Sequence, residues 1–244
     1  MLRFILVAVT VIGFLILSIP VLIIEWIIGK FSPHARDISS LRIIQSVFRL
    51  ILKETGAKIT VIGHENVPKN ETVLYVGNHR SYFDILMTYC RCPGLTGYVA
   101  KDGMEKVPLL STWMKRLYCL FLKRDDVRQG LQTILTGIEQ MKNGISMAIF
   151  PEGTRNHQKE MLPFKEGSLK MAEKTGCAII QMAISNYDDI FENHIPFIKP
   201  AKVILEYGAP IYPKELSREE KKFLGATTQK HIQKMLDQHE KMEL

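Results

Sequence analysis

The sequence predicts a single α/β domain with a mostly parallel or mixed central sheet flanked by helices, preceded by an N-terminal membrane helix and an amphipathic helix. Three observations support this class. The 244-residue chain is 46% hydrophobic and 23% charged, close to the globular averages of roughly 45–50% and about 25%. Residues 4–24 contain no charge. From about residue 57 onward, short β-rich runs alternate with helical patterns, as in α/β proteins.

The first predicted element is a helix over the uncharged segment Phe4–Ile24. A helix of this length extends about 30 Å, which matches the hydrocarbon thickness of a bilayer. Gly13 and Pro20 interrupt the run, but membrane helices tolerate both. A cleaved signal peptide fits less well, because the run is too long and no small-residue cleavage site follows it. A helix buried in the core of the domain is the remaining alternative.

Basic residues are distributed unevenly around this segment. Arg3 alone precedes it. Basic residues follow it at Lys30, Arg36, Arg42, Arg49 and Lys53. The positive-inside rule therefore predicts that the body of the protein lies on the cytoplasmic side of the cell (inner) membrane.

A second, amphipathic helix is predicted over residues 38–54. Its apolar residues share one face: Leu41, Ile44, Val47, Phe48 and Ile51. Its polar residues lie elsewhere: Arg42, Gln45, Arg49 and Lys53. The helix lies either on the bilayer surface or against the domain, and the sequence leaves both open. We therefore divide the chain into membrane-anchoring helices over residues 1–54 and an α/β domain over residues 55–244.

The α/β region contains a series of β-rich runs. They are Lys58–Ile62, Val73–Val76, Gly97–Ala100, Leu117–Leu122, Ile145–Phe150, Ala178–Ile184 and Val203–Tyr207. The clearest helical pattern covers residues 127–142. Its apolar stripe is Val127, Leu131, Ile134, Leu135, Ile138 and Met141. A last helix is expected from Ser217, because Ser217 and Glu220 form a capping-box pattern.

The chain is basic, with a net charge of +7 and a pI near 9.2. This balance favours an anionic partner, such as a membrane surface, a phosphorylated substrate or nucleic acid. We expect no nucleic-acid partner, because the basic residues are spread out and no binding motif with interleaved aromatics occurs. The four cysteines lack zinc-site spacing, so we expect no metal site and reduced thiols. Nucleotide-binding, serine-hydrolase and zinc-protease motifs are also absent from the sequence.

The most informative stretch runs from Val76 to Asp84, Val-Gly-Asn-His-Arg-Ser-Tyr-Phe-Asp. It leaves a predicted strand and enters a helical pattern, where ligand crevices commonly form. His79 and Asp84 would lie about 140° apart on one continuous helix, so they meet only if His79 precedes the helix. Either Asp84 closes a capping box with Ser81 and His79 is an ordinary loop residue, or Asp84 orients His79 as a general base for a substrate hydroxyl. In the second case, backbone N–H groups at the helix start would stabilise an oxyanion.

Two further stretches follow predicted strands. Residues 150–155, Phe-Pro-Glu-Gly-Thr-Arg, stop a strand at Pro151, permit a tight turn at Gly153 and present Arg155 as a phosphate clamp. An ordinary strand-ending loop is the alternative. Residues 123–124, Lys-Arg, are either a second phosphate contact or a solvated strand end.

In this order, behind an apolar N-terminus, these stretches resemble the glycerolipid acyltransferase family, most nearly its bacterial 1-acyl-glycerol-3-phosphate (lysophosphatidate) acyltransferases. The first motif of the family, Asn-His-x-x-x-x-Asp, is matched by Asn78, His79 and Asp84. Its third motif, Phe-Pro-Glu-Gly-Thr-Arg, is matched throughout residues 150–155. The resemblance covers about residues 57–210.

The resemblance implies a role for each matched residue. His79 would be the catalytic base that deprotonates the glycerol hydroxyl, and Asp84 would orient it. The implied substrate-binding residues, with Arg155 on the acceptor phosphate, are Glu152, Gly153, Thr154, Arg155, Arg124 of the second motif, and Lys101. The sequence departs from the family at Tyr118, where the second motif begins with Gly, and at residues 180–182, Ile-Gln-Met, where the fourth motif carries Pro. Both regions bear on the acceptor and the acyl channel.

The implied reaction moves a fatty acyl group from acyl-CoA or acyl-ACP to the free hydroxyl of 1-acyl-glycerol-3-phosphate, which makes phosphatidate in phospholipid biosynthesis. The thioester is a co-substrate, and no metal or cofactor is implied. The expected partners are lysophosphatidate, the acyl thioester, the lipid bilayer and, with acyl-ACP as donor, the acyl carrier protein. The alternatives are transfer to another lysophospholipid or glycerol-phosphate acceptor, and a thioesterase that uses the same dyad to activate water.

Overall fold

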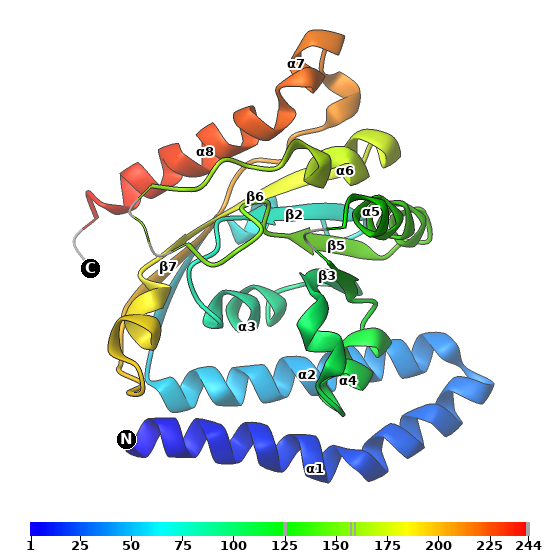
Figure 1. Cartoon of the computed structure of the whole chain (residues 1–244), viewed down its shortest axis with the longest axis vertical. Coiled ribbons are helices and arrows are strands. Elements are labelled where there is room, and N and C mark those ends of the chain that lie inside the picture. Colours follow the sequence, from blue (N-terminus) through cyan, green and yellow to red (C-terminus); the bar gives the residue numbers. More distant parts are fainter. Residues whose placement is uncertain (124–125, 157, 159, 243–244) are drawn as a thin grey trace.

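The computed structural model describes residues 1–123, 126–156, 158 and 160–242, which form a mixed seven-stranded sheet between helical layers (Figure 1). The strands are β1 Lys58–Ile62, β2 Val73–Gly77, β3 Thr96–Lys101, β4 Leu120–Leu122, β5 Ser146–Ile149, β6 Ala178–Ser185 and β7 Lys202–Tyr207. Their order across the sheet is β1-β7-β6-β2-β5-β3-β4. The predicted α/β class with a mixed central sheet is therefore confirmed.

Most of the sheet is parallel. Strands β4, β3, β5, β2 and β6 pair in parallel, whereas β7 is antiparallel to β6 and parallel to β1. The central strands β2, β5 and β6 are almost entirely buried, which explains their continuous apolar runs. The carboxyl ends of the parallel strands meet at one edge of the sheet, where ligands bind in open α/β folds. Both sequence motifs leave the sheet at this edge.

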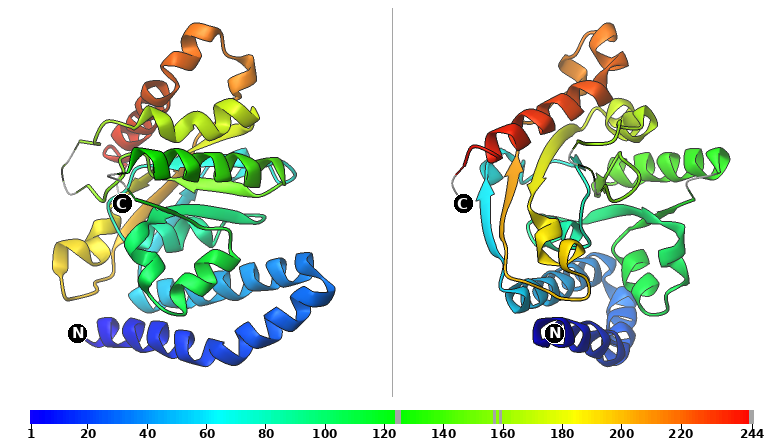
Figure 2. Two further views of the ribbon diagram at one scale, coloured as in Figure 1. Left: turned by 45° about the vertical axis from the view of Figure 1, so that its right-hand side comes forward. Right: turned by 60° about the vertical axis from the view of Figure 1, so that its left-hand side comes forward.

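Helices cover both faces of the sheet (Figures 1 and 2). One face carries α2 Pro33–Thr55, α3 Phe83–Tyr89 and α4 Leu110–Arg116. The other face carries α5 Val127–Lys142, α6 Lys170–Thr175 and α8 Leu224–His239, which follows the short α7 Arg218–Lys222. Each face has its own cluster of buried apolar side chains. The sheet therefore lies in the middle of the molecule, and its carboxyl edge lies between the two helical layers.

The strand predicted from Leu117 is wrong at its start. Leu117 caps the carboxyl end of α4, and Tyr118 adopts the left-handed backbone conformation with a φ of 60°. This conformation is incompatible with a strand, so β4 begins only at Leu120. The Tyr118 hydroxyl donates a hydrogen bond to Asp37 on α2. Tyr118, which departs from the family pattern, thus connects this turn to the N-terminal helices by a hydrogen bond.

The two helices predicted in the C-terminal half of the chain are found in the structure. The helix over residues 127–142 is confirmed as α5, but its apolar stripe is only partly covered: Met141 is buried, whereas 89% of Val127 is exposed. The capping box at Ser217 and Glu220 is confirmed by hydrogen bonds of 2.7 and 3.2 Å. The helix that it starts, α7, ends after a few residues, and α8 continues from there.

Helix α1 (Leu2–Phe31) lies antiparallel alongside α2 as the outermost layer (Figures 1 and 2). In the described part of the chain it is the one helix long and apolar enough to cross a membrane, by length and composition. At one end of the pair, Arg3 Nη1 donates to the Glu54 carbonyl oxygen at 3.0 Å. Near the other end, Ser39 Oγ donates to Glu25 Oε1 at 2.6 Å. The helix therefore lies along the domain and does not project from it.

Helix α2 begins earlier than predicted, at Pro33, because Ser32 caps it and proline suits the first helical position. Its apolar face is packed into the core of the domain, so packing against the domain is the correct alternative. Gln45, expected on the polar face, is fully buried. Its Nε2 donates to the carbonyl oxygen of Tyr89, the last residue of α3, at 3.1 Å and to that of Cys92 at 2.9 Å. The four cysteines carry free thiols. The division of the chain at residue 54 stays a prediction.

Candidate active site

The loop after β2 carries the first motif, and Asn78 sets where this loop begins. Asn78 Nδ2 donates to the Ile184 carbonyl oxygen on β6 at 2.8 Å, and the Ile184 N–H donates to Asn78 Oδ1 at 2.8 Å. The buried side chain thereby extends the pairing of β2 with β6 after the backbone has left the sheet. Asn78 therefore has a structural role, and it determines the point from which His79 departs.

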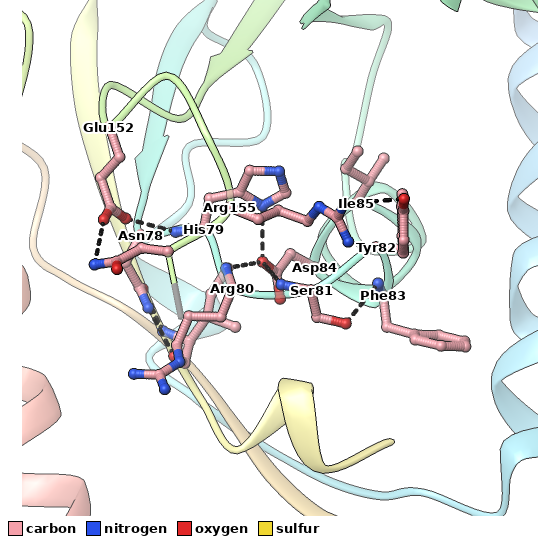
Figure 3. Close-up of polar contacts among 12 residues, drawn as sticks. Asn78, His79, Arg80, Ser81, Tyr82, Phe83, Asp84, Ile85, Glu152 and Arg155 are labelled. Carbon is pink, nitrogen blue, oxygen red and sulfur yellow. Dashed lines mark hydrogen bonds and ion pairs between the residues drawn. The ribbon is translucent and has the colours of Figure 1, made fainter. Parts of the chain in front are cut away.

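His79 and Asp84 are in direct contact (Figure 3). His79 Nδ1 lies 2.9 Å from Asp84 Oδ2, and Asp84 is fully buried in the first turn of α3. The same carboxylate oxygen accepts the backbone N–H groups of Arg80 at 2.7 Å and Ser81 at 2.8 Å. A carboxylate oxygen can only accept, so in the neutral imidazole this contact assigns the hydrogen to Nδ1 and leaves Nε2 as the acceptor nitrogen of the ring.

The same residues also bind the backbone at the start of α3. Asp84 accepts the Ser81 N–H, which is one half of the predicted capping box, and Ser81 Oγ accepts the N–H of Phe83 at 3.0 Å. The box is incomplete, because Tyr82 is the N-cap residue of α3 and the Asp84 N–H donates to the Ser81 carbonyl oxygen. One carboxylate thus closes the start of α3 and holds the imidazole. The capping and dyad interpretations of the sequence are therefore compatible, because both describe the same geometry.

Backbone N–H groups at the start of α3 were expected to stabilise an oxyanion. In the structure each of the four is already bound. The donor–acceptor pairs are Arg80–Asp84, Ser81–Asp84, Tyr82–Glu192 and Phe83–Ser81. These four groups therefore offer no free donor, and the expectation is wrong for this turn.

Phe150 fixes the plane of the imidazole. The ring centroids of His79 and Phe150 lie 4.4 Å apart with an interplanar angle of 15°, a stacked arrangement. Phe150 follows β5, which pairs in parallel with β2 so that Val76 lies opposite Ile149. The two motifs meet because their strands are neighbours in the sheet.

Glu152 binds the backbone of His79 (Figure 3). Glu152 Oε1 accepts the His79 N–H at 2.8 Å, and Oε2 accepts the Leu162 N–H at 2.9 Å and Asn156 Nδ2 at 3.0 Å. The Asn156 N–H donates to the His79 carbonyl oxygen at 2.7 Å. Both backbone polar groups of His79 are therefore held by the loop after β5, and Glu152 is a positioning residue in this geometry. Its role in substrate binding stays a prediction.

Arg155 is held beside the dyad with its guanidinium partly exposed. Its Cζ lies 3.6 Å from the ring centroid of Tyr82, and Nη2 donates to Tyr82 Oη at 2.9 Å. Nη1 lies 3.4 Å from Oε1 of Glu192, whose side chain is nearly fully buried. Figure 3 shows the guanidinium of Arg155 directed toward Tyr82. The planar cation is thus fixed in place, while 29% of its side chain stays accessible.

Comparison with known proteins identifies the family. Residues 58–185, more than half of the chain, match the family model described as Acyltransferase.

The chain belongs to the acyltransferase family.

Among its relatives, a 1-acyl-sn-glycerol-3-phosphate acyltransferase of Borreliella burgdorferi is 31% identical over 200 residues, which cover 81% of this chain and 79% of that protein. One of the same name from Saccharomyces cerevisiae is 28% identical over 214 residues, 86% of this chain and 68% of that protein. The crystal structure of the 1-acyl-sn-glycerophosphate (LPA) acyltransferase PlsC from Thermotoga maritima shares the fold, with a TM-score of 0.81, 24% identity, and coverage of 96% of this chain and 95% of that one. The resemblance noted from the motifs is therefore confirmed at the level of the family and the fold.

Three other predicted substrate-binding residues of this acyltransferase, Gly153, Thr154 and Lys101, lie on the same edge of the sheet. Gly153 adopts a φ of 73°, a conformation that favours glycine. Thr154 is exposed in the same loop, and Lys101 is exposed at the carboxyl end of β3. Within the described residues, no hydrogen bond joins Thr154 or Lys101 to the dyad. Arg124 lies outside the residues that the structure describes.

Two acidic residues that shape the site of the acyltransferase gave no local signal in the sequence. Arg80 Nε and Nη2 donate to Asp188 Oδ2 at 3.1 and 2.9 Å, and Glu192 accepts from Tyr82 and Arg155. Both acidic residues follow β6, more than 100 residues after the first motif. Their proximity depends on the pairing of β2 with β6, which local spacing does not reveal.

A cavity of about 520 Å³ borders Asn78, Arg80 and Glu152, but neither His79 nor Arg155 lines it. Five acidic residues are among its other lining residues, Glu160, Asp188, Asp189, Asp237 and Glu240, beside amide and apolar side chains. The carboxylates outnumber the one cation of this lining, Arg80, so repulsion disfavours a phosphate there. Among the described residues, no group of three His, Cys, Asp or Glu side chains is placed to hold a metal ion.

Proposed function

We propose that this acyltransferase transfers a fatty acyl group from acyl-CoA or acyl-ACP to the free hydroxyl of 1-acyl-glycerol-3-phosphate and makes phosphatidate. The observation that carries the proposal is the 2.9 Å contact of His79 with buried Asp84, which leaves Nε2 as a base beside the guanidinium of Arg155. Relatives that bear the name of this reaction support the choice of acceptor. The donor is an acyl thioester of either carrier.

The chemistry follows from the tautomer of the imidazole. His79 Nε2 accepts the proton of the acceptor hydroxyl while the hydroxyl oxygen attacks the thioester carbonyl carbon. A C–O bond forms, the tetrahedral intermediate collapses, and the C–S bond breaks. The imidazolium then returns its proton to the departing thiolate. Asp84 stabilises the imidazolium between the two proton transfers, and Glu152 keeps the ring in place through the backbone.

Arg155 is the residue we assign to the phosphate of the acceptor. Its planar guanidinium presents several N–H donors in a fork that matches a phosphate, and Tyr82 and Glu192 occupy only part of them. The exposed residues Lys101 and Thr154, together with Gly153 and Arg124, are proposed to line the remainder of the substrate site. The reaction in this proposal needs no metal or cofactor. The side chain of His79 supplies the base, that of Asp84 the carboxylate, and that of Arg155 the cation that binds the phosphate.

The function is tested with the purified full-length protein, an acyl thioester supplied as acyl-CoA or acyl-ACP, and a panel of acceptors. The panel contains lysophosphatidate, glycerol 3-phosphate, lysophosphatidylcholine, monoacylglycerol and water alone. We expect phosphatidate from lysophosphatidate as the fastest reaction. A faster reaction with another acceptor would replace the proposed acceptor, and release of fatty acid at the same rate without any acceptor would identify a thioesterase.

Substitution of Arg155 by alanine is expected to raise the KM for lysophosphatidate by about 10–100-fold, because a hydrogen bond to a charged group contributes about 1.5–3 kcal/mol. The KM for the acyl thioester is expected to change little. Initial rates at varied concentrations of each substrate check this. Arg155→Lys keeps the charge but loses the fork, so an intermediate KM is expected. Equal increases in both KM values would remove the role of Arg155 on the phosphate.

The placement in the membrane is also proposed from geometry. Apolar side chains on α1 repeat every three or four residues and are exposed along its whole length: Ile5, Val9, Ile12, Ile16, Ile19 and Ile23. Because α1 lies against α2, which packs on the domain, we infer that this stripe lies in the acyl region of one leaflet. The catalytic domain then rests on the cytoplasmic side of the cell (inner) membrane, as the basic residues after α1's apolar run predict.

Washing membranes with alkaline carbonate is expected to leave the protein in the pellet. The variant I12K/I19K is expected to shift most of the protein to the supernatant, because a charged side chain in the bilayer costs about 2.5–3.5 kcal/mol. The matched control L131K/L135K places the same charges on the exposed stripe of α5 and is expected to stay in the pellet. Release of the wild-type protein would make α1 a peripheral helix.

A further inference from the structure

A groove at the carboxyl end of α2 combines cationic and apolar side chains. It has a volume of about 460 Å³ and lies between α2, the start of β1 and the turn after α3. Its cationic residues are Arg49, Lys53 and Arg91, and its apolar floor includes Leu52, Ile59 and Cys90. No carboxylate is among the described residues that line it. We call this feature the basic groove.

The three cations are available to a ligand. Arg49 Nη2 donates to the Cys90 carbonyl oxygen at 3.1 Å, and Arg91 Nη1 donates to the Met87 carbonyl oxygen at 2.7 Å. Each guanidinium has five N–H donors, so these backbone contacts fix the side chains and leave other donors unused. Lys53 is exposed, and its side-chain ammonium group makes no hydrogen bond or ion pair with the described residues.

Both guanidinium groups line the basic groove together with the Cys90 thiol. Burial raises the pKa of the Cys90 thiol to about 11, and the positive charges of Arg49 and Arg91 act in the opposite direction by favouring the thiolate. The groove is therefore a region of positive potential over an apolar floor. A small inorganic anion would use only the charge, whereas a phospholipid would use both features.

The position of the groove matches the level of lipid headgroups. The carboxyl end of α2 lies beside the amino end of α1, where Arg3 binds the Glu54 carbonyl oxygen (Figure 1). The exposed apolar stripe of α1 is on the outer side of this pair. The apolar stripe of α1 and the helix α2 are separated by one helix diameter, about 10 Å. If the stripe lies in the acyl region, α2 therefore lies at the depth of the lipid phosphates of the same leaflet.

We propose that the basic groove binds the headgroup of an anionic phospholipid of the bilayer, with its phosphate on Arg49, Lys53 and Arg91 and its glycerol and first acyl carbons on the apolar floor. The proposal rests on the membrane placement described above. The site is separate from the catalytic site, because Arg91 follows the carboxyl end of α3 whereas His79 precedes its amino end. The bound lipid is therefore a membrane contact and not the acyl acceptor.

The test measures lipid binding to the full-length protein in neutral detergent by native mass spectrometry, with phosphatidylglycerol or phosphatidylcholine added. We expect the wild-type protein to retain phosphatidylglycerol in preference to phosphatidylcholine. Each cation near a lipid surface contributes about 1 kcal/mol, so K53Q is expected to weaken phosphatidylglycerol binding about fivefold and R49Q/K53Q/R91Q about 100-fold. K53Q is included because the exposed Lys53 has no structural contact to lose.

The matched control K222Q/K230Q/K234Q removes the same charge from exposed positions of α7 and α8. It is expected to bind phosphatidylglycerol like the wild-type protein. Equal binding by the groove variants, an equal loss in the control, or full displacement of the lipid by inorganic phosphate at the same concentration would each overturn the proposal. Phosphatidate formation at saturating lysophosphatidate in detergent is measured in parallel and is expected to be unchanged in the groove variants, which separates this site from the proposed catalysis.

Discussion

Substitution of His79 by alanine is expected to lower the turnover of acyl transfer by about 10²–10⁴-fold, the usual contribution of a general base. This is about 3–5.5 kcal/mol of transition-state stabilisation. The imidazole is the one group in the described site whose acceptor nitrogen is kept ready by a buried carboxylate, so no neighbour replaces it. Product formation from acyl thioester and lysophosphatidate measures the loss.

The fold is expected to survive this substitution. The His79 side chain stacks on Phe150 at the edge of the sheet, and the contacts that hold the loop use the His79 backbone. Circular dichroism and thermal unfolding provide the check. His231→Ala, at an exposed position of α8, is the matched control and is expected to keep full turnover. A His79→Ala protein that folds and keeps near-normal turnover would remove His79 from the mechanism.

Substitution of Asp84 by asparagine is expected to have the second largest effect, a loss of about 10²–10⁴-fold in turnover. The neutral amide no longer stabilises the imidazolium that forms during transfer. It also no longer selects the tautomer of His79 that carries its hydrogen on Nδ1. The backbone N–H groups of Arg80 and Ser81 still have an amide oxygen to donate to, so the start of α3 is retained. Turnover and thermal unfolding are measured on the same preparation.

The double variant separates a positioning role from a purely structural one. If Asp84 acts through His79, then H79A/D84N loses no more turnover than His79→Ala alone, because the two residues work as a unit. A further large loss in the double variant, together with a lower unfolding temperature, would indicate that Asp84 supports the loop independently of the imidazole.

The elements of the fold could be predicted wherever burial leaves a periodic pattern. Strands β1, β2, β5, β6 and β7 are found within about one residue of their predicted limits. For the central strands β2, β5 and β6 the reason is burial on both faces, which makes them apolar throughout. The prediction failed at Leu117, which is apolar but belongs to the end of α4. It also overestimated the burial of α5, where Val127 and Leu131 are apolar and yet exposed.

The contact of His79 with Asp84 could be predicted because the two residues are five apart and the start of α3 fixes their geometry. Contacts between distant segments could not be predicted. The contact of the Glu152 carboxylate with the backbone of His79 is one of these, and the predicted role of Glu152 in substrate binding stays a prediction. The roles of Asp188 and Glu192 depend on the pairing of β2 with β6 and leave no local spacing to detect. A sequence pattern thus predicts contacts between residues that are close in the sequence. The contacts that position the site residues join distant segments and depend on the order of strands in the sheet.

The measurement that tests the central claim most directly follows a labelled acyl group from the thioester into products. The wild-type protein is supplied with lysophosphatidate, and both phosphatidate and free fatty acid are quantified in a single time course. The account predicts that the label enters phosphatidate in proportion to the acceptor added, and that His79→Ala abolishes this incorporation while binding of lysophosphatidate persists. Label that appears only in free fatty acid, or incorporation that survives in His79→Ala, would contradict it.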